Sequence, residues 1–315
     1  MMKKYYLGID LGGTRVKMGI VYDGKVVERH IVPARSANGL AESLPQLREE
    51  MDLLMSRIPE EYGTLAGVGL AFPGLVNTTT KKILSTNKKY DDAPALDLSQ
   101  WVMDTWGVPF FLDNDARMAT VGEWKYGAAT DTDNLVVMTI GTGVGTSVVM
   151  EGKLIRGKHF QAGCLGGHFT VQVNGRPCSC GNAGCIEAHG STWSLDAIIR
   201  EHKLFYSSSL SKAALLDFSA LFKAAAENDP LALEIRQYSM EVWSAGVVSL
   251  IHAYDPEVVV IGGGVLHSAD VILPFIQAKV KQHAWTPWGT VDIRATKLTE
   301  DAGILGVVYC LQHNI

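Results

Sequence analysis

The sequence lacks long apolar runs and has no surplus of positive charge. A membrane-spanning helix needs about 20 consecutive apolar residues, and no stretch of the 315 residues approaches that length. Asp10 interrupts the apolar start of the chain, so we expect no secretory signal either. The formal net charge is -5, whereas nucleic-acid-binding surfaces are basic. These absences disfavour membrane and nucleic-acid partners, and the 47% apolar content predicts substantial folded cores.

Two common nucleotide-binding signatures are also absent. The chain contains no Walker-type Gly-Lys-Ser/Thr sequence. Gly141-x-Gly143-x-Gly145 has the wrong third spacing for the dinucleotide fingerprint, and we expect a strand rather than a helix after it. Any phosphate site in this chain must therefore use another kind of turn.

An internal repeat supplies such a turn. Residues 13–27 align without gaps with residues 141–155, and six of the fifteen aligned positions are identical. Each copy follows a β-rich stretch and reads as strand, glycine turn, strand, turn, strand. A Gly-Thr turn presents backbone N–H groups and a hydroxyl to phosphate oxygens, although a single glycine turn would more often be only a hairpin. The duplication, together with Gly262-Gly263-Gly264 after a third apolar strand, favours nucleotide binding.

Three of the five cysteines are clustered. Cys178, Cys180 and Cys185 lie within eight residues, and His168 precedes them. One imidazole and three thiolates suit a closed tetrahedral zinc site, which leaves no open position for chemistry and would be structural. The alternative is reduced thiols without a metal, but free thiols rarely cluster in this way. An odd cysteine count with such a cluster fits a reducing compartment, so we expect a cytoplasmic protein.

A carboxylate-rich triplet follows another apolar strand. Asp113-Asn114-Asp115 comes after residues 108–112 and before an expected helix. Side chains at the carboxyl end of such a strand point to where α/β proteins bind ligands. A carboxylate there can accept a proton from a substrate hydroxyl that attacks a phosphoryl group. Capping of the next helix by Asp113 or Asp115 is an equally good interpretation of the spacing alone.

The hydrophobic pattern predicts an α/β protein with two lobes. We expect an N-terminal lobe at 1–120, with the C-terminal helix 302–315 packed on it, and a larger lobe at 121–301 that carries the cysteine loop 168–187. The expected strands are 5–10, 15–22, 25–34, 64–71, 109–113, 134–140, 145–151 and 257–262. The expected helices are 39–56, 98–106, 115–125, 193–203, 213–227, 231–254, 270–283 and 302–312.

These motifs together resemble the ROK family of sugar kinases. The first phosphate motif is Asp10-Leu-Gly-Gly-Thr-Arg-Val-Lys17, the second is Gly141-Thr-Gly-Val-Gly145, and Asn114-Asp115-Ala116 matches the family's Asn-Asp-Ala element. Cys178-Ser-Cys-Gly-Asn-Ala-Gly-Cys-Ile-Glu187 matches the family's zinc signature residue for residue. The resemblance implies a two-lobed actin-like fold, with duplicated β-hairpin phosphate motifs, a structural zinc loop and a sugar cleft between the lobes. It implies ATP-dependent phosphorylation of a hexose or hexose derivative at the 6-hydroxyl.

The resemblance also implies a role for each matching position. Asp115 would be the catalytic base, and the zinc ligands would be His168, Cys178, Cys180 and Cys185. Sugar contacts would come from Gly74, Asn87, Asn114, Asp115, His168 and Glu187. The nucleotide and its phosphates would contact Asp10, Gly12, Gly13, Thr14, Gly141, Thr142, Gly143, Gly262 and Gly263, with Asp10 near the magnesium that accompanies ATP. The implied partner is a small sugar. Members of the family are often dimers, so the resemblance also implies a homodimer.

One position departs from the family pattern. The family reads Glu-x-Gly-His before the zinc cysteines, and that glutamate contacts the sugar near its 1- and 2-hydroxyls, whereas this chain reads Leu165-Gly-Gly-His168. A buried sugar hydroxyl left unpaired costs about 1–3 kcal/mol. We therefore expect either a sugar with a different C1 or C2 arrangement or a contact from another residue, and a weak kinase is the third interpretation. Glucose is accordingly predicted to be a poor substrate relative to another hexose.

Three other classes of protein compete with the kinase interpretation. A repressor of the same fold carries a helix-turn-helix ahead of the first phosphate motif, which begins here at Asp10. A zinc-ribbon nucleic-acid binder is disfavoured by the acidic net charge. A non-catalytic or weakly catalytic sugar sensor is the stronger alternative, because Leu165 replaces the usual sugar-binding glutamate.

Overall fold

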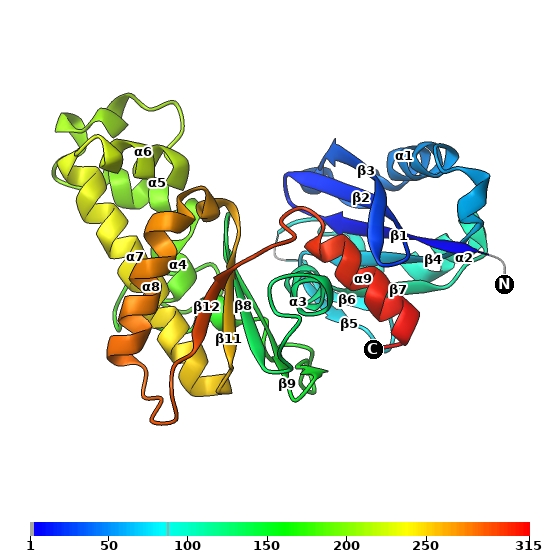
Figure 1. Ribbon diagram of the computed structural model, residues 1–315. Coiled ribbons are helices and arrows are strands. Elements are labelled where there is room, and N and C mark those ends of the chain that lie inside the picture. Colours follow the sequence, from blue (N-terminus) through cyan, green and yellow to red (C-terminus); the bar gives the residue numbers. More distant parts are fainter. Residues whose placement is uncertain (1–2, 87) are drawn as a thin grey trace. The chain divides into compact units, whose positions relative to one another are not determined.

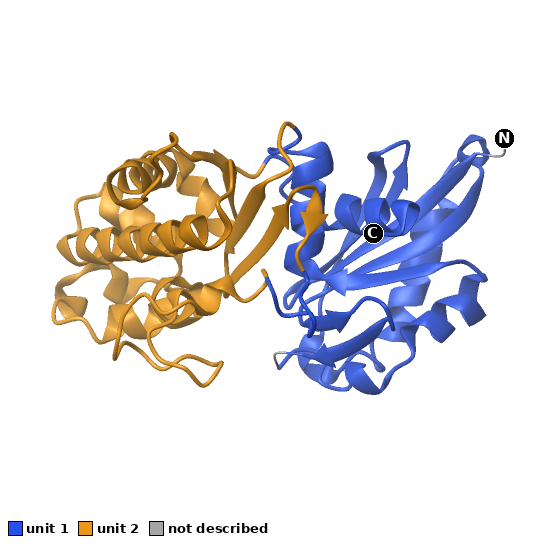
Figure 2. Ribbon diagram, turned by 90° about the horizontal axis from the view of Figure 1, so that it is seen from below, with its two compact units in different colours: residues 1–130, 156–162, 297–315 blue, residues 131–155, 163–296 orange. Residues whose placement is uncertain are grey.

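Two five-stranded sheets with the same strand order form the framework of the protein. The computed structural model describes residues 3–86 and 88–315 (Figure 1). Contacts divide the chain into unit 1, residues 1–130, 156–162 and 297–315, and unit 2, residues 131–155 and 163–296 (Figure 2). The expected boundary at residue 120 falls inside a helix of unit 1, and residues 156–162 return to unit 1 from within the expected second lobe.

The sheet of unit 1 has the order β3-β2-β1-β4-β7. Its strands are β1 (Lys4–Leu11), β2 (Arg15–Tyr22), β3 (Lys25–Pro33), β4 (Thr64–Phe72) and β7 (Phe110–Asn114). The first three strands are antiparallel, and β4 and β7 run parallel to β1. A separate small hairpin joins β5 (Leu75–Asn77) and β6 (Lys82–Ser85), and neither strand was predicted.

The sheet of unit 2 has the matching order β10-β9-β8-β11-β12. Its strands are β8 (Leu135–Ile140), β9 (Val144–Met150), β10 (Lys153–Leu154), β11 (Val258–Gly262) and β12 (Asp292–Ala295). In both units an antiparallel hairpin pair is followed by two parallel strands. The predicted duplicated hairpin is confirmed, and the likeness of the two units extends to the whole of each sheet.

Helices cover these sheets within each unit. Unit 1 contains α1 (Leu44–Ser56), α2 (Leu98–Trp106), α3 (Asp115–Tyr126) and α9 (Ala302–His313). Unit 2 contains α4 (Ile186–Gly190), α5 (Thr192–Arg200), α6 (Phe218–Ala226), α7 (Pro230–Tyr254) and α8 (Ala269–His283). Short 3₁₀ turns occur at η1 (Ser36–Asn38), η2 (Glu60–Tyr62), η3 (Ala93–Ala95), η4 (Gly166–His168), η5 (Phe205–Ser207), η6 (Ser209–Lys212) and η7 (Gly264–Ser268). None of the helices in the described residues is both long and apolar enough to cross a membrane.

The alternation of β1 explains how both faces of its sheet are covered. Leu7, Ile9 and Leu11 are fully buried in the core that also contains the apolar side of α1. The intervening Gly8 faces α9, where a β-carbon at that position would lie 2.8 Å from the Ile304 side chain. Successive side chains of a strand point to opposite faces. The sheet of unit 1 is therefore packed between α1 on one face and α9 on the other (Figure 1).

Helices α3 and α9 of unit 1 approach each other at a glycine. A β-carbon at Gly306 of α9 would lie 1.8 Å from the Met118 carbonyl oxygen of α3, so no larger residue fits without a shift of the backbone. This contact places the C-terminal helix within unit 1, on the element that begins at Asp115.

A buried ion-pair network attaches residues 156–162 to unit 1. The Asp113 carboxylate, fully buried at the end of β7, pairs with Arg117 at 3.3 Å and Arg156 at 2.9 Å. Arg117 also donates to the Phe160 and Ala162 carbonyls, at 2.8 and 3.1 Å. Asp113 is thus a structural residue, because both of its carboxylate oxygens are committed to arginines.

Candidate active site and metal centre

In the first glycine turn, residues 12–14, all three carbonyl groups accept hydrogen bonds from other parts of the chain, whereas two N–H groups are left without a partner among the described residues. The carbonyl oxygens of Gly12, Gly13 and Thr14 accept hydrogen bonds from Tyr90 Oη at 3.1 Å, Ser36 Oγ at 2.8 Å and Ala34 N at 2.9 Å. The N–H groups of Gly13 and Thr14 have no protein partner in the described part of the chain. Backbone N–H groups seldom stay unpaired unless water or a ligand reaches them. The turn therefore offers donors suited to an anion such as phosphate.

Asp10 is the penultimate residue of β1, two residues before this turn begins. Its Oδ2 is 3.3 Å from Lys17 Nζ, which in turn lies 3.1 Å from Glu300. Burial raises the pKa of Asp10, and the charge and hydrogen bond of Lys17 oppose that rise. Magnesium in phosphate sites is commonly held by one or two carboxylates plus the phosphates themselves. A single carboxylate beside a phosphate turn fits this donor set.

Asn114 caps α3 and holds its neighbours in place. Its Oδ1 accepts from the Arg117 N–H at 3.1 Å, the bond of an N-cap residue. Its Nδ2 donates to the Gly74 carbonyl at 3.0 Å and to Asp115 Oδ1 at 2.8 Å. Because both amide hydrogens are used, a ligand can reach only the remaining acceptor site on Oδ1. The helix cap is thus Asn114, rather than either neighbouring aspartate.

Asp115 has one satisfied carboxylate oxygen and one unused oxygen. Its Oδ1 accepts from the Ala116 N–H at 2.8 Å and from Asn114 Nδ2. Its Oδ2 has no hydrogen-bond partner among residues 3–86 and 88–315. Burial and then the charge of Asp10 raise the pKa of Asp115 to about 6, whereas Lys89 acts to lower it. A carboxylate with a pKa near neutrality and an open oxygen is suited to general-base chemistry.

Lys89 is a cation at this site that the sequence analysis did not identify. A β-carbon at Gly13 would lie 2.8 Å from Lys89 Cε and 3.1 Å from Nζ, so the side chain lies over the first glycine turn. Its charge also acts on Asp115. The Lys88-Lys89 pair is visible in the sequence, but nothing local indicates that one of them reaches the turn. Asn87, predicted to contact the sugar, lies outside the described residues.

The second glycine turn repeats the arrangement of the first. The carbonyls of Gly141 and Thr142 accept from the N–H groups of Thr192 and Trp193 at the start of α5, at 2.9 and 3.2 Å. The N–H groups of Thr142 and Gly143 have no protein partner in the described segments. In both copies of the repeat, the carbonyl groups of the turn are hydrogen-bonded to other elements, and two N–H groups of the turn remain available to a ligand. The two turns are equivalent in this respect although the elements that hold them are unrelated.

The glycine loop after β11 lies beside this second turn. Gly263 adopts a positive φ of 96°, and a β-carbon there would lie 2.1 Å from the Ile140 carbonyl oxygen. Ile140 is the last residue of β8 and precedes Gly141. Gly262 and Gly263 are therefore near the second turn within unit 2.

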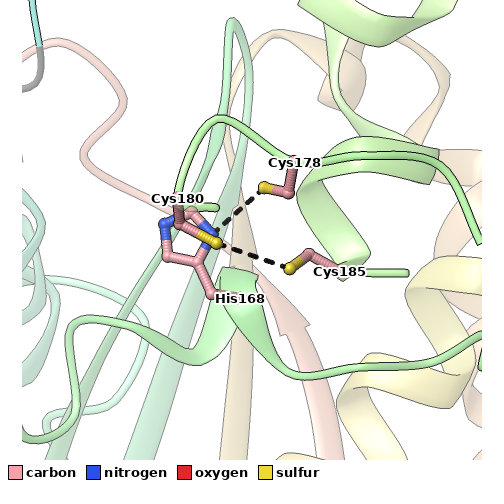
Figure 3. A group of neighbouring side chains, drawn as sticks. All are labelled: His168, Cys178, Cys180 and Cys185. Carbon is pink, nitrogen blue, oxygen red and sulfur yellow. Dashed lines mark hydrogen bonds between the residues drawn. The ribbon is translucent and has the colours of Figure 1, made fainter. Parts of the chain in front are cut away.

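His168, Cys178, Cys180 and Cys185 converge in unit 2 (Figure 3). Their candidate ligand atoms all lie within 4.8 Å of one another. His168 Nδ1 is 3.5 Å from Cys178 Sγ, and Cys180 Sγ is 3.7 Å from Cys185 Sγ. A tetrahedral zinc ion with Zn–S bonds of about 2.3 Å sets its sulfur ligands about 3.8 Å apart. The donor types and separations therefore fit zinc, with Nδ1 toward the metal and Nε2 remaining for another contact.

Without a bound cation, the Cys185 thiol of this cluster keeps its proton. Burial, together with hydrogen bonds and charge from the neighbouring cysteines, raises the pKa of Cys185 to about 12. Three thiolates this close repel one another, so they are stable as ligands when a divalent cation balances their charge.

The loop around the cluster is shaped by short backbone contacts. The Cys178 N–H donates to the Asn182 carbonyl at 2.8 Å, which closes the turn between the first two cysteines and the third. Thr170 pairs with Cys185 in an isolated antiparallel bridge. A β-carbon at Gly167 would lie 2.0 Å from the Val144 carbonyl oxygen, so η4 lies directly on β9. The local glycines thus bring the cluster against the strand that follows the second turn.

Glu187 lies on α4 just after the last cysteine, and its carboxylate is directed at the second turn. Its Oε2 accepts from the Val144 N–H at 2.9 Å, and the residue is 8% exposed. Its Oε1 accepts a long hydrogen bond of 3.4 Å from Ser179 Oγ, between two of the cysteines. The family resemblance implied only a sugar contact for Glu187, and nothing in the sequence indicates the hydrogen bond from Val144.

The candidate residues thus form two groups, one in each unit. Unit 1 contains the first turn, the Asp10 carboxylate and the helix start with the base, that is Asp10, Gly12, Gly13, Thr14, Gly74, Asn114 and Asp115. Unit 2 contains the second turn, the glycine loop and the cysteine cluster, that is Gly141, Thr142, Gly143, His168, Cys178, Cys180, Cys185, Glu187, Gly262 and Gly263.

The known proteins that this chain resembles include glucokinases and xylose repressors. A glucokinase from Thermotoga maritima is 31% identical, over 100% of this chain and 99% of the relative. A xylose repressor from Bacillus subtilis is 27% identical, over 96% of this chain and 76% of the repressor. The crystal structure of a ROK hexokinase from Thermus thermophilus is 27% identical with a TM-score of 0.78, covering 99% of this chain and 100% of that chain. The ROK family model matches residues 6–314, and the chain therefore belongs to the ROK family.

Proposed function

We propose that this protein transfers a phosphoryl group from ATP to the 6-hydroxyl of a hexose or hexose derivative, with Asp115 as the general base. The observation that carries the proposal is the state of the Asp115 carboxylate. One oxygen is fixed by the Ala116 and Asn114 donors, the other is open, and the pKa is raised to about 6. General bases work best when their pKa lies near the working pH. Kinship to a glucokinase over the whole chain supports the same reaction.

Each group of residues has a part in the proposed reaction. Asp115 takes the proton from the sugar hydroxyl as that oxygen attacks the terminal phosphorus, and Asn114 keeps the carboxylate oriented. The unpaired N–H groups of the two glycine turns bind phosphate oxygens. Asp10 would hold Mg²⁺, which when bound offsets the negative charge of the phosphates. Exclusion of water directs the phosphoryl group to the sugar rather than to hydrolysis.

The cysteine cluster has a structural part in the same proposal. His168, Cys178, Cys180 and Cys185 would hold zinc as a closed four-ligand site, so the metal stabilises the loop and takes no part in phosphoryl transfer. With Nδ1 directed to the cluster, His168 presents Nε2 to a sugar hydroxyl. Within unit 2, His168 and Glu187 are the proposed sugar contacts.

Leu165 is proposed to set the choice of sugar. It precedes η4, its carbonyl accepts from the His168 N–H at 3.0 Å, and it is 37% exposed. An aliphatic side chain there cannot bond the 1- and 2-hydroxyls that the family glutamate contacts. A sugar that buries those hydroxyls against Leu165 loses about 1–3 kcal/mol, or about 5- to 150-fold in kcat/KM. Glucose is therefore expected to be a poor substrate relative to a hexose with another C1 or C2 arrangement.

A panel of hexoses and hexose derivatives, assayed by ADP release with ATP and Mg²⁺, tests the proposal. We expect turnover of at least one sugar, with glucose well below it. The L165E variant restores the family pattern and should raise kcat/KM for glucose relative to the preferred sugar. Glucose turnover equal to or above that of every other sugar would refute the role of Leu165, and absence of turnover with every sugar would refute the kinase.

The second candidate is a sugar sensor of the same fold that binds without turnover. Two observations favour it, namely Leu165 at the glutamate position and the likeness to a xylose repressor over 96% of this chain. The two candidates differ in the response to D115A. A kinase loses phosphorylation and keeps sugar binding, whereas the wild-type sensor has binding and no turnover to lose.

A further inference from the structure

Residues 167–187, which contain the four candidate metal ligands and are called the metal-binding loop below, hold the second glycine turn at Val144. Its N–H donates to Glu187 Oε2 at 2.9 Å, in a bond that is fully buried. Beside its carbonyl oxygen, Gly167 approaches so closely that a β-carbon there would lie 2.0 Å away. Gly167 precedes the candidate ligand His168, and Glu187 follows the candidate ligand Cys185 by two residues. The N–H and the carbonyl group of Val144, the first residue of β9, are therefore both contacted by this part of the chain.

Gly143, the turn residue next to Val144, is shaped by the same carboxylate. A β-carbon at Gly143 would lie 2.5 Å from Glu187 Oε2, which is shorter than any ordinary contact. The nearest obstacle to a side chain at this motif position is thus Glu187. A side chain at the third residue of the Gly-Thr-Gly turn would have to displace this carboxylate.

The other oxygen of Glu187 connects back to the cysteine loop. Ser179, which lies between Cys178 and Cys180, donates to Oε1 at 3.4 Å. Cys185 is the residue directly before α4, the five-residue helix that carries Glu187. The position of the carboxylate therefore depends on the loop on both sides, through Ser179 and through the start of α4.

We infer that Glu187 is a positioning residue for the phosphate turn at Gly141–Gly143, and that the metal-binding loop sets the geometry of the phosphoryl-donor site through it. This goes beyond the sugar contact that the resemblance implies for Glu187, and it rests on the proposed function only in taking the turn as a phosphate site. With its carbonyls bonded to α5 and its end bonded to Glu187, the turn presents the N–H groups of Thr142 and Gly143 in a fixed direction. A donor array fixed in advance binds an anion without paying to order itself.

Amide hydrogen exchange of the segment around Val144 tests the contact directly and needs no substrate. In the E187A variant we expect this amide to exchange at least about tenfold faster, since its charged acceptor is lost. E187Q keeps a carbonyl oxygen of the same reach and should exchange at a rate closer to wild type. E201Q is the matched control, because Glu201 pairs with Arg176 of the same loop but does not touch the turn. Removal of bound metal with a chelator should accelerate exchange in the wild type as E187A does.

Affinity for a non-hydrolysable ATP analogue, measured by calorimetry without sugar, tests the consequence. We expect about tenfold weaker binding in E187A, partial recovery in E187Q and no change in E201Q. A Glu187 that only contacts sugar would leave nucleotide affinity unchanged in all three, and that result would overturn the inference. If the wild type binds no nucleotide while the exchange result holds, the proposed kinase function fails and the positioning contact stands.

A second variant guards against a simple folding defect in E187A. In G143A the new methyl group would displace the Glu187 carboxylate, so exchange at Val144 should accelerate as in E187A. In the double variant G143A/E187A the Glu187 carboxylate is already absent. Adding G143A to E187A should therefore accelerate exchange at Val144 much less than adding G143A to the wild type. Additive effects of the two substitutions would contradict the direct contact.

Discussion

Protonation of Asp115 should control the acid limb of the pH–rate profile, that is, the fall in kcat/KM at low pH. With a pKa raised to about 6, about nine tenths of this carboxylate is ionised at pH 7 and about one tenth at pH 5. Only the ionised form accepts the proton of the sugar hydroxyl. We therefore expect kcat/KM, which reports the free enzyme, to fall about tenfold between pH 7 and pH 5. In the D115N variant kcat should fall by about 10²- to 10⁴-fold, and the residual activity should lose this limb.

The neighbours of Asp115 should move its titration midpoint in opposite directions. The charge of Asp10 raises the pKa of Asp115, so D10N should shift the midpoint to lower pH. The charge of Lys89 lowers the pKa, so K89M should shift the midpoint to higher pH. Both shifts are measured without Mg²⁺ and ATP, as the midpoint of the Asp115 carboxyl titration in NMR, because Mg²⁺ at Asp10 would offset the charge that D10N removes. Shifts in the same direction for the two variants would contradict the electrostatic explanation.

The same pKa has a consequence for stability that requires no substrate. The folded protein holds the Asp115 proton more tightly than the unfolded chain, whose ordinary value is 3.8. The stability linked to the protonated carboxyl is fully present below the unfolded pKa and is lost as pH rises through about 6. D115N should therefore have a higher Tm than the wild type at pH 7, and the difference should vanish below about pH 4. An acid limb that persists in D115N, or a lower Tm for D115N at pH 7, would refute the role given to this carboxylate.

Three further substitutions test the framework. C185A should abolish stoichiometric zinc, measured by metal analysis, and lower the Tm; a variant that keeps one zinc per chain would argue against the assigned ligands. D113A leaves two arginines without their buried partner and should lower the free energy of unfolding by about 3–5 kcal/mol in denaturant titration; a loss below about 1 kcal/mol would contradict that. G306A places a methyl group against the Met118 carbonyl and should destabilise by about 1–3 kcal/mol or more, so an unchanged Tm would mean that α3 and α9 are less closely packed.

Local patterns predicted much of the fold. The hairpins of both copies were predicted because Asp23-Gly24 and Glu151-Gly152 each place a glycine in a two-residue turn, and the structure has all four residues at φ between 49° and 71°. The 98–106 helix was predicted to the residue, since Asp97 caps its start and Gly107 ends it in the left-handed region. Signals of this kind are contained within a few neighbouring residues.

Helix starts were less accurate where a distant residue decides them. A helix was expected from residue 39, but α1 begins at Leu44 because Asp92 accepts hydrogen bonds from the Leu40 and Ala41 N–H groups and holds them in a loop. A start at residue 213 was wrong for a local reason, because Asp217 caps α6 through the Ala220 N–H. An aspartate at this spacing before an apolar run is itself a helix-capping pattern.

Strands and contacts that depend on tertiary pairing were not predictable. β12 is four residues long, contains both charged and apolar side chains, and exists because it pairs with β11. Some contacts of the candidate site also depend on tertiary structure and could not be predicted. Spacing indicated the cysteine cluster and the carboxylate triplet, but the contact between Lys89 and the first turn and the bond from Val144 to Glu187 join segments 76 and 43 residues apart.

Product analysis with the wild type and D115A tests the central claim most directly. The account predicts that the wild type converts its preferred hexose to the 6-phosphate with one ADP released per sugar, identified by phosphorus and carbon NMR. It also predicts that D115A binds the same sugar in calorimetry without forming product. Wild-type protein that binds sugar and forms no phosphorylated product, or D115A that keeps the wild-type rate, would contradict the account.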